Sequence, residues 1–257
     1  MPDVVVVQAK PYSPNVSGGY NPGNENYVEA KYFDEMTDVT VRHDFVRKVY
    51  GILTLQLLFT FGMVALFVLN DDVVQFFAAN SGILTVCYVI SIICIVAIIC
   101  CQETARKHPQ GIILLVVFTI AEGILIGAIS AQFEAKEVVV AVGITFAIFF
   151  SLSIFACQTK YDFSGTGPYL MVAFVVLILF AIVLIFIDED QRVRTALSAL
   201  FVILFSFFIV YDTQLIIGGN GQKYQLEVDE YVFGALSLYL DIINLFLCVL
   251  SLLGGDG

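Results

Sequence analysis

The sequence predicts an all-α membrane protein built as a bundle of seven transmembrane helices. Hydrophobic residues make up 59% of the 257 residues and charged residues only 14%, with a mean hydropathy of +0.91. A soluble domain must cover itself with more charge than this. Seven stretches also reach the roughly 20 apolar residues that a helix needs to cross a bilayer. None shows the two-residue alternation of a membrane β-strand.

Residues 1–46 are predicted to be a disordered cytoplasmic tail, and residues 47–257 the transmembrane domain. The tail contains a segment rich in Pro, Gly, Asn and Tyr without apolar periodicity, KPYSPNVSGGYNPGNENY. Such a composition does not bury enough apolar surface to fold. The tail also lacks a charged segment followed by an apolar one, so we expect no cleavable signal peptide and insertion directed by the first span.

The seven spans follow one another closely after residue 48. Pro109 and Pro168 stand where the third and fifth spans begin, a place where a helix tolerates a missing N–H. Because lipid satisfies no backbone polar group, each span must be helical. The predicted spans are about 49–69, 82–101, 110–130, 138–157, 169–187, 196–217 and 231–253.

The basic residues near the membrane set the orientation, because Lys and Arg are retained on the cytoplasmic side during insertion. One side of the membrane has seven: Arg42, Arg47, Lys48, Arg106, Lys107, Lys160 and Lys223. The other side has three: Lys136, Arg192 and Arg194. We therefore expect a cytoplasmic N-terminus and, with an odd number of spans, a C-terminus on the opposite side.

Three acidic residues lie inside predicted spans, where a charge costs on the order of 2.5–3.5 kcal/mol on insertion scales. Glu122 lies near the middle of the third span, Asp212 near the end of the sixth and Asp241 within the seventh. At 1.5 Å per residue, Asp212 lies roughly 8 Å and Asp241 roughly 15 Å below the cytoplasmic surface. Because their helices are antiparallel and joined by a short loop, the two carboxylates are expected to meet.

Two carboxylates that share a site do not both ionise freely, and one proton then belongs to the pair. Such a pair is a proton sensor, and its oxygen atoms are also ligands that Ca²⁺ prefers. The sequence therefore predicts Asp212 and Asp241 as a cation and proton sensor pair, with Glu122 as a weaker site. Arg106 and Lys107 lie near the same membrane surface and are candidates to reach the pair.

Several other classes of function are disfavoured. The net charge of −11 argues against nucleic acid as a partner. No predicted span contains a histidine, which argues against intramembrane zinc or serine hydrolysis, and no nucleotide-binding motif is present. We expect no enzyme activity and no cofactor. No CxxC spacing predicts a disulfide framework or a metal cluster from Cys87, Cys94, Cys100, Cys101, Cys157 and Cys248.

Five segments carry a resemblance to a known family. They are FVRKVYGILTLQLLFT, CQETARKHPQG, AEG, VYDTQLIIGG and YVFGALSLYLDIINLFL. In this order and spacing, the stretch from Arg42 to Leu253 resembles the transmembrane BAX-inhibitor-motif family, and within it the Lifeguard branch. The resemblance implies a bundle with a central last helix and a di-aspartyl sensor at Asp212 and Asp241. It also implies a basic latch, for which Arg106 is the matching residue.

The function that the resemblance implies is a pH-sensitive calcium leak channel of the endoplasmic reticulum or Golgi that restrains programmed cell death. Its partners are the lipid bilayer, calcium ions, protons and other membrane proteins of cell-death signalling. The alternative is a membrane scaffold that conducts no ion and regulates cell death or stress through protein partners. A seven-helix ligand receptor is a weaker third reading, because the cytoplasmic loops are too short for an obvious transducer surface.

Overall fold

A computed structural model describes residues 25–100, 106, 109–186, 191–218 and 222–254 of the chain. The chain divides into two units, residues 1–39 and 40–257. Helix α1 (Glu25–Val68) begins in the first unit and continues into the second. The predicted tail thus overlaps the start of α1, and its residues 1–24 lie outside the described part, as does Cys101.

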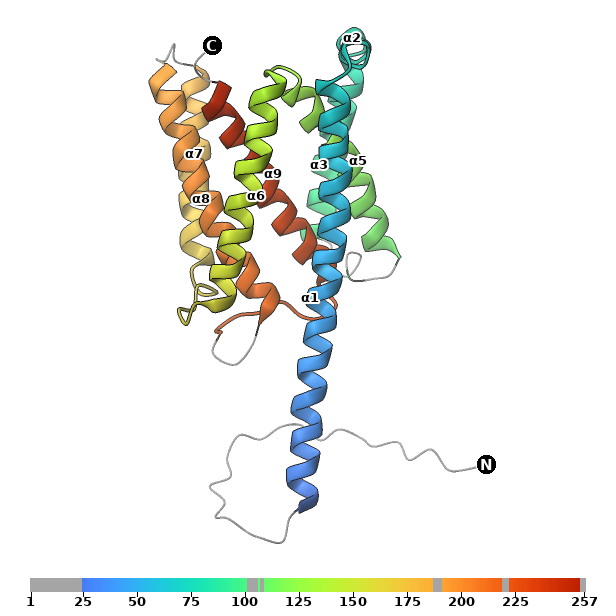
Figure 1. Ribbon diagram of the computed structural model, residues 1–257, viewed down its shortest axis with the longest axis vertical. Coiled ribbons are helices and arrows are strands. Elements are labelled where there is room, and N and C mark those ends of the chain that lie inside the picture. The colour runs from blue at the N-terminus through green and yellow to red at the C-terminus, as the bar shows by residue number, and fades with distance from the viewer. Residues whose placement is uncertain (1–24, 101–105, 107–108, 187–190, 219–221, 255–257) are drawn as a thin grey trace, which may run out of the picture. The chain divides into compact units, whose positions relative to one another are not determined.

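The second unit is a helical bundle, in which seven helices are long and apolar enough to span a membrane (Figure 1). They confirm the all-α membrane fold, and the number of spans found in the described residues equals the number predicted. In the part of the chain that the structure describes, the helices given after α1 are α2 (Asp71–Ala79), α3 (Gly82–Cys100), α5 (Gln110–Ser130), α6 (Ala135–Gln158), α7 (Gly167–Ile185), α8 (Gln191–Ile217) and α9 (Tyr231–Leu253).

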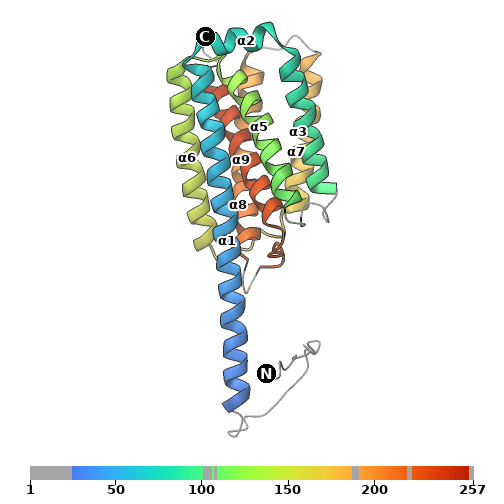
Figure 2. The same cartoon turned by 90° about the vertical axis from the view of Figure 1, so that its right-hand side faces the viewer.

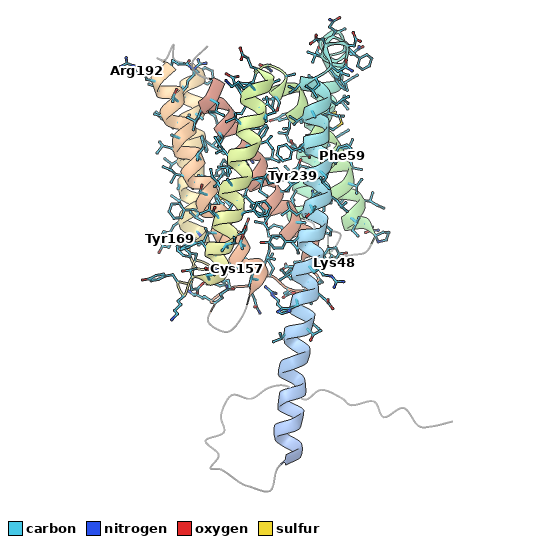
Figure 3. All side chains as sticks on the ribbon, in the orientation of Figure 1. Lys48, Phe59, Cys157, Tyr169, Arg192 and Tyr239 are labelled. Atoms are coloured by element: carbon cyan, nitrogen blue, oxygen red, sulfur yellow. The ribbon has the colours of Figure 1, made fainter. Side chains whose placement is uncertain are left out.

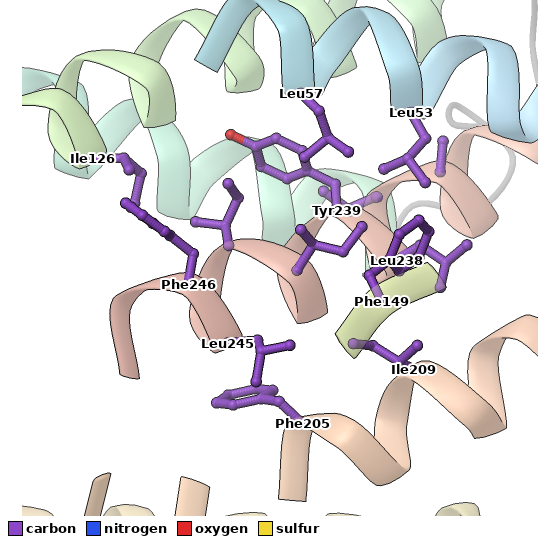
Figure 4. Close-up of a cluster of buried hydrophobic side chains, with 14 of the residues drawn as sticks. Leu53, Leu57, Ile126, Phe149, Phe205, Ile209, Leu238, Tyr239, Leu245 and Phe246 are labelled. Atoms are coloured by element: carbon purple, nitrogen blue, oxygen red, sulfur yellow. The ribbon is translucent and has the colours of Figure 1, made fainter. Parts of the chain in front are cut away.

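The last helix, α9, is the centre of the bundle, with other helices on several sides of it (Figures 1 and 2). In the most apolar window of α9, 56% of the residues are buried, compared with 6% in α7. Apolar side chains from four neighbouring helices pack on it, and Figure 4 shows part of this core. It includes Leu53 and Leu57 of α1, Ile126 of α5, Phe149 of α6, and Phe205 and Ile209 of α8.

Helix α2, which is too short to span a membrane, lies across the end of the bundle between α1 and α3 (Figure 2). The side chain of Asn70 accepts a hydrogen bond from the backbone N–H of Asp72 and so caps its first turn. The Phe77 ring packs on Phe67 of α1 with centroids 4.9 Å apart. The cap thus stabilises the first turn of α2, and the aromatic contact packs the helix on α1.

Two glycines on one face of α5 let α1 approach closely, as small residues do where membrane helices pack. A Cβ atom at Gly123 would lie 3.0 Å from the Phe59 ring, and one at Gly127 would lie 2.7 Å from the Phe67 ring. Phe67 is only 2% exposed, so its ring has little space to move. The close packing of α1 on α5 therefore depends on the missing side chain at Gly127.

We expect Gly127→Ala to lower the free energy of unfolding by about 1–3 kcal/mol, the usual cost of overpacking a filled interface. The matched control is Gly143→Ala on α6, where an added Cβ meets nothing within 4 Å. This control should unfold like the wild type or be slightly more stable, since alanine favours helix over glycine. Denaturant titration of both variants in detergent measures the difference, and equal stability would contradict the packing argument.

Candidate functional site

Two buried aspartates lie together where α8 and α9 pack against each other. Asp212 is 8% and Asp241 6% exposed, and both helices contribute mainly apolar side chains around them. The Asp212 carboxyl group is close enough to interact with the Asp241 carboxyl group and with Ser237, one turn before Asp241. The structure therefore brings together the two acids that the sequence predicted to meet.

Neither α8 nor α9 has a basic side chain near the aspartate pair. Helix α9 contains no Lys, Arg or His, and Arg194 of α8 is 18 residues from Asp212, roughly 27 Å along the helix. A hydrogen bond between two carboxyl groups needs one proton, because two carboxylates both only accept. Oδ2 of Asp241 is buried and has no hydrogen-bond partner. The site is thus suited to hold a proton and, without it, to attract a cation.

The C-terminus of α8, five residues after Asp212, is capped by an arginine from α1. Arg42 donates from Nε to the Ile217 carbonyl at 2.9 Å, from Nη2 to the Leu215 carbonyl at 2.7 Å, and from Nη1 to the Leu226 carbonyl. A cation at this position also favours the negative end of the helix dipole. The chain then leaves α8 through Gly218, whose φ of +61° suits glycine.

Arg106 binds the segment that leads into α9. Its guanidinium lies 2.8 Å from Glu227, 3.4 Å from Asp229 and 2.7 Å from Glu230. These three carboxylates raise the pKa of Arg106 above its ordinary value, and the hydrogen bond that Arg106 donates to Glu230 contributes most. The predicted latch residue therefore contacts the loop between α8 and α9, and the carboxylates of this loop compensate its charge.

The α6–α7 loop holds the same segment from another side. Asp162 accepts a hydrogen bond from the Lys223 backbone N–H at 2.9 Å, and Ser164 accepts one from the Tyr224 N–H at 3.0 Å. The bonds of Asp162 to Ser164 and to Lys223 lower the pKa of its carboxyl group. We call the α8–α9 loop and its three anchors, Arg42, Arg106 and Asp162 with Ser164, the loop clamp. It covers the end of the bundle nearest to Lys48, which Figure 3 labels.

The comparisons with known proteins identify the family. The family model described as "Inhibitor of apoptosis-promoting Bax1" matches residues 42–257, which include the whole site. The chain belongs to this BAX-inhibitor-motif family. It is 35% identical to protein lifeguard 3 of Homo sapiens over 240 residues, which cover 92% of this chain and 76% of the relative.

Two further relatives support the Lifeguard resemblance. The chain is 37% identical to protein lifeguard 3 of Mus musculus over 224 residues, covering 86% of this chain and 72% of the relative. It is 33% identical to protein LIFEGUARD 4 of Arabidopsis thaliana over 233 residues, covering 90% and 92%. The resemblance seen in five short segments thus extends over most of the chain.

The remaining predicted residue, Glu122, lies on α5 and not with the aspartates. Its Oε1 accepts a hydrogen bond from Ser91 of α3 at 2.6 Å. Sequence reasoning missed Arg42 as a site residue and counted it only for orientation. The available signal was the Gly218-Gly219 pair at the end of α8, which marks a helix C-terminus that needs a cap, but nothing local to it points to residue 42.

Proposed function

We propose that this BAX-inhibitor-motif protein is a pH-sensitive calcium leak channel of an endomembrane, in the endoplasmic reticulum or Golgi. Its activity restrains programmed cell death, which fits the family description. The observation that carries the proposal is the contact between Asp212 and Asp241, two buried acids on facing helices without a basic side chain from either helix nearby. With one shared proton the pair is a monoanion, and after losing it the pair is a dianion that attracts Ca²⁺.

The loop clamp supplies the mechanical part of this proposal. It joins the ends of α8 and α9 that lie on the same side of the membrane as the basic loops, the predicted cytoplasmic side. Arg42, Arg106 and Asp162 come from three different segments of the chain, so the clamp holds α8 and α9 to the rest of the bundle. A charge change at the aspartates alters how α8 packs on α9, and the clamp limits how far they separate.

The alternative function is a non-conducting scaffold that acts on protein partners. The family description favours it, since it names a protein, Bax1, as what is inhibited. In that case the aspartate pair contributes only to helix packing and the exposed apolar helices face other membrane proteins. Neither function requires an enzymatic step.

Reconstitution of the purified full chain in liposomes separates the two functions. An enclosed calcium dye reports influx while an ionophore for potassium sets the membrane potential. We expect influx to increase in proportion to the protein in the membrane and to change between mildly acidic and mildly alkaline pH. The control uses liposomes that contain the same protein and enclose a membrane-impermeant dye. Release of this dye detects unspecific rupture of the membrane. Calcium influx equal to that of protein-free liposomes at every pH would favour the scaffold.

A further inference from the structure

A second group of polar side chains lies inside the bundle, on the face of α9 opposite to Asp241. Tyr239 precedes Asp241 by two residues, which places the two side chains about 200° apart around the helix. Tyr239 is fully buried, and its hydroxyl group shares a hydrogen bond of 2.8 Å with Thr60 of α1. Its ring lies among the apolar side chains of the core (Figure 4), so this polar contact is surrounded by hydrocarbon.

The same group continues onto α5 and α3. On α5, Thr119 and Glu122 are one turn apart, and Thr119 accepts a hydrogen bond of 2.9 Å from Gln56 of α1. Glu122 accepts its bond from Ser91 of α3, and Phe118, one turn before Glu122 on α5, packs edge-on against the Tyr239 ring with centroids 5.7 Å apart. We call this set the Glu122 cluster, and its members are Gln56, Thr60, Ser91, Thr119, Glu122 and Tyr239.

The Glu122 cluster contains one acid and no base. Helices α3, α5 and α9 have no Lys, Arg or His, and the last basic residue of α1, Lys48, is eight residues before Gln56, roughly 12 Å along the helix. The titratable groups that share faces with Glu122 or Ser91 are Tyr239 on α9 and two thiols on α3, at Cys87 and Cys94, one turn on either side of Ser91. All of them are neutral or anionic, so none compensates a negative charge on Glu122.

The hydrogen bonds of the cluster also leave an acceptor without a donor. Oε1 of Gln56 is buried and has no partner, although Gln56 is only 5% exposed. An ionised Glu122 would add further acceptors to a cluster that already has one too many. Glu122 is half-buried in an apolar bundle without a basic partner. An acid in this situation reaches a stable state by taking up a proton, which removes its charge and adds a donor.

We propose that Glu122 is a proton-binding site, separate from the aspartate pair, held by the hydroxyl group of Ser91. A calcium site is disfavoured here because Ca²⁺ takes six to eight oxygen ligands with several carboxylates, and this cluster has a single carboxyl group. The central helix α9 therefore has a protonatable site on each of two opposite faces. Loss of the Glu122 proton leaves an uncompensated charge between α3, α5 and α9 and opens this side of the bundle to water.

Infrared spectroscopy of the full chain in lipid nanodiscs tests this assignment without reference to calcium flux. A protonated carboxyl group has a C=O stretching band distinct from that of a carboxylate. We expect the wild type at neutral pH to show such a band that is absent in Glu122→Gln. In Ser91→Ala the band should persist and shift to higher frequency, because the carboxyl group loses a hydrogen-bond donor. The matched control is Glu134→Gln, which changes an exposed glutamate and should leave the band intact.

Two results would overturn the proposal. The first is a neutral-pH spectrum in which Glu122→Gln removes a carboxylate band and leaves the carboxyl band unchanged. This result would show that Glu122 is ionised. Loss of the carboxyl band on addition of sodium, potassium or calcium chloride, one at a time at constant pH, would show that the site binds that cation instead. Retention of the carboxyl band in each salt supports a proton as the ion bound at Glu122. This conclusion holds whether or not the protein conducts calcium.

Discussion

Asp241→Asn is expected to abolish the pH response of calcium flux without unfolding the protein. Asparagine cannot ionise, and its amide group donates to Asp212 as the protonated carboxyl group does in the wild type. When Asp212 is ionised, the variant therefore carries one negative charge at the pair, as the state with one shared proton does, and it cannot reach the dianion. Wild-type flux changes by up to about tenfold per pH unit if one proton controls opening, since one unit corresponds to 1.36 kcal/mol. In the variant we expect that ratio to fall to about one.

The companion variants test whether the charge of the pair is the controlling quantity. Asp212→Asn should behave like Asp241→Asn, and the double variant should resemble the fully protonated pair. Asp72→Asn is the matched control, because it removes an acid from the exposed α2 and should retain the wild-type pH response. Flux measured in liposomes at several pH values, with size-exclusion chromatography to verify folding, gives the comparison. A wild-type pH response in both single variants would remove the aspartates as the sensor.

The spans could be predicted closely from the sequence because lipid imposes a simple requirement. Each crossing needs a continuous apolar run, so the hydropathy of residues 82–101 or 231–253 locates α3 and α9 within a few residues. The short helix α2 was not predicted, since its nine residues are too few for a span. Its local signals were the cap at Asn70 and the two acids of its first turn, Asp71 and Asp72, which favour a helix N-terminus.

The aspartate pair could also be predicted, because two facts about it are local. The depth of Asp212 and Asp241 follows from their distance to the span ends, and a short loop makes α8 and α9 antiparallel neighbours. The partner of Arg106 could not be found this way. Three acids, Glu227, Asp229 and Glu230, lie nearer to its guanidinium at the membrane surface, where an ion pair forms without desolvating a charge inside the bundle.

The polar contacts between distant helices could not be predicted for a different reason. Gln56 and Thr119 are separated by 63 residues, and Thr60 and Tyr239 by 179. Serine, threonine and glutamine occur in many membrane helices and carry little penalty, so no local pattern indicates which of them meet. Their pairing depends on the rotation of α1 and α5 about their axes, which packing at Gly123 and Gly127 determines.

The largest effect on stability is expected from Arg42→Gln. The wild-type guanidinium donates to the carbonyl groups of Leu215, Ile217 and Leu226, which are 173 to 184 residues away in the chain. Hydrogen bonds from a charged donor contribute about 1.5–3 kcal/mol each, and carbonyl groups left without a donor cost more when water cannot reach them. Because the site is partly buried, we expect a loss of about 2–4 kcal/mol in the free energy of unfolding.

The matched control for this change is Arg47→Gln, which removes an equal charge from an exposed position on the same helix. It should reduce the free energy of unfolding by less than about 0.5 kcal/mol, as surface substitutions usually do. Arg42→Lys should fall between the two, because an ammonium group keeps the charge but not the planar set of donors. Denaturant titration in detergent measures all three, and similar losses in Arg42→Gln and Arg47→Gln would show that only charge matters.

The same substitution distinguishes a structural cap from a part of the proposed gate. If the loop clamp limits the separation of α8 and α9, Arg42→Gln should raise calcium flux at constant pH and also speed amide hydrogen exchange in residues 222–230. The Gly127→Ala variant serves as the comparison, because it destabilises the bundle at the α1–α5 contact and leaves the clamp in place. Raised flux in Arg42→Gln but not in Gly127→Ala links the clamp to opening. An equal rise in both would instead assign the leak to general loss of packing.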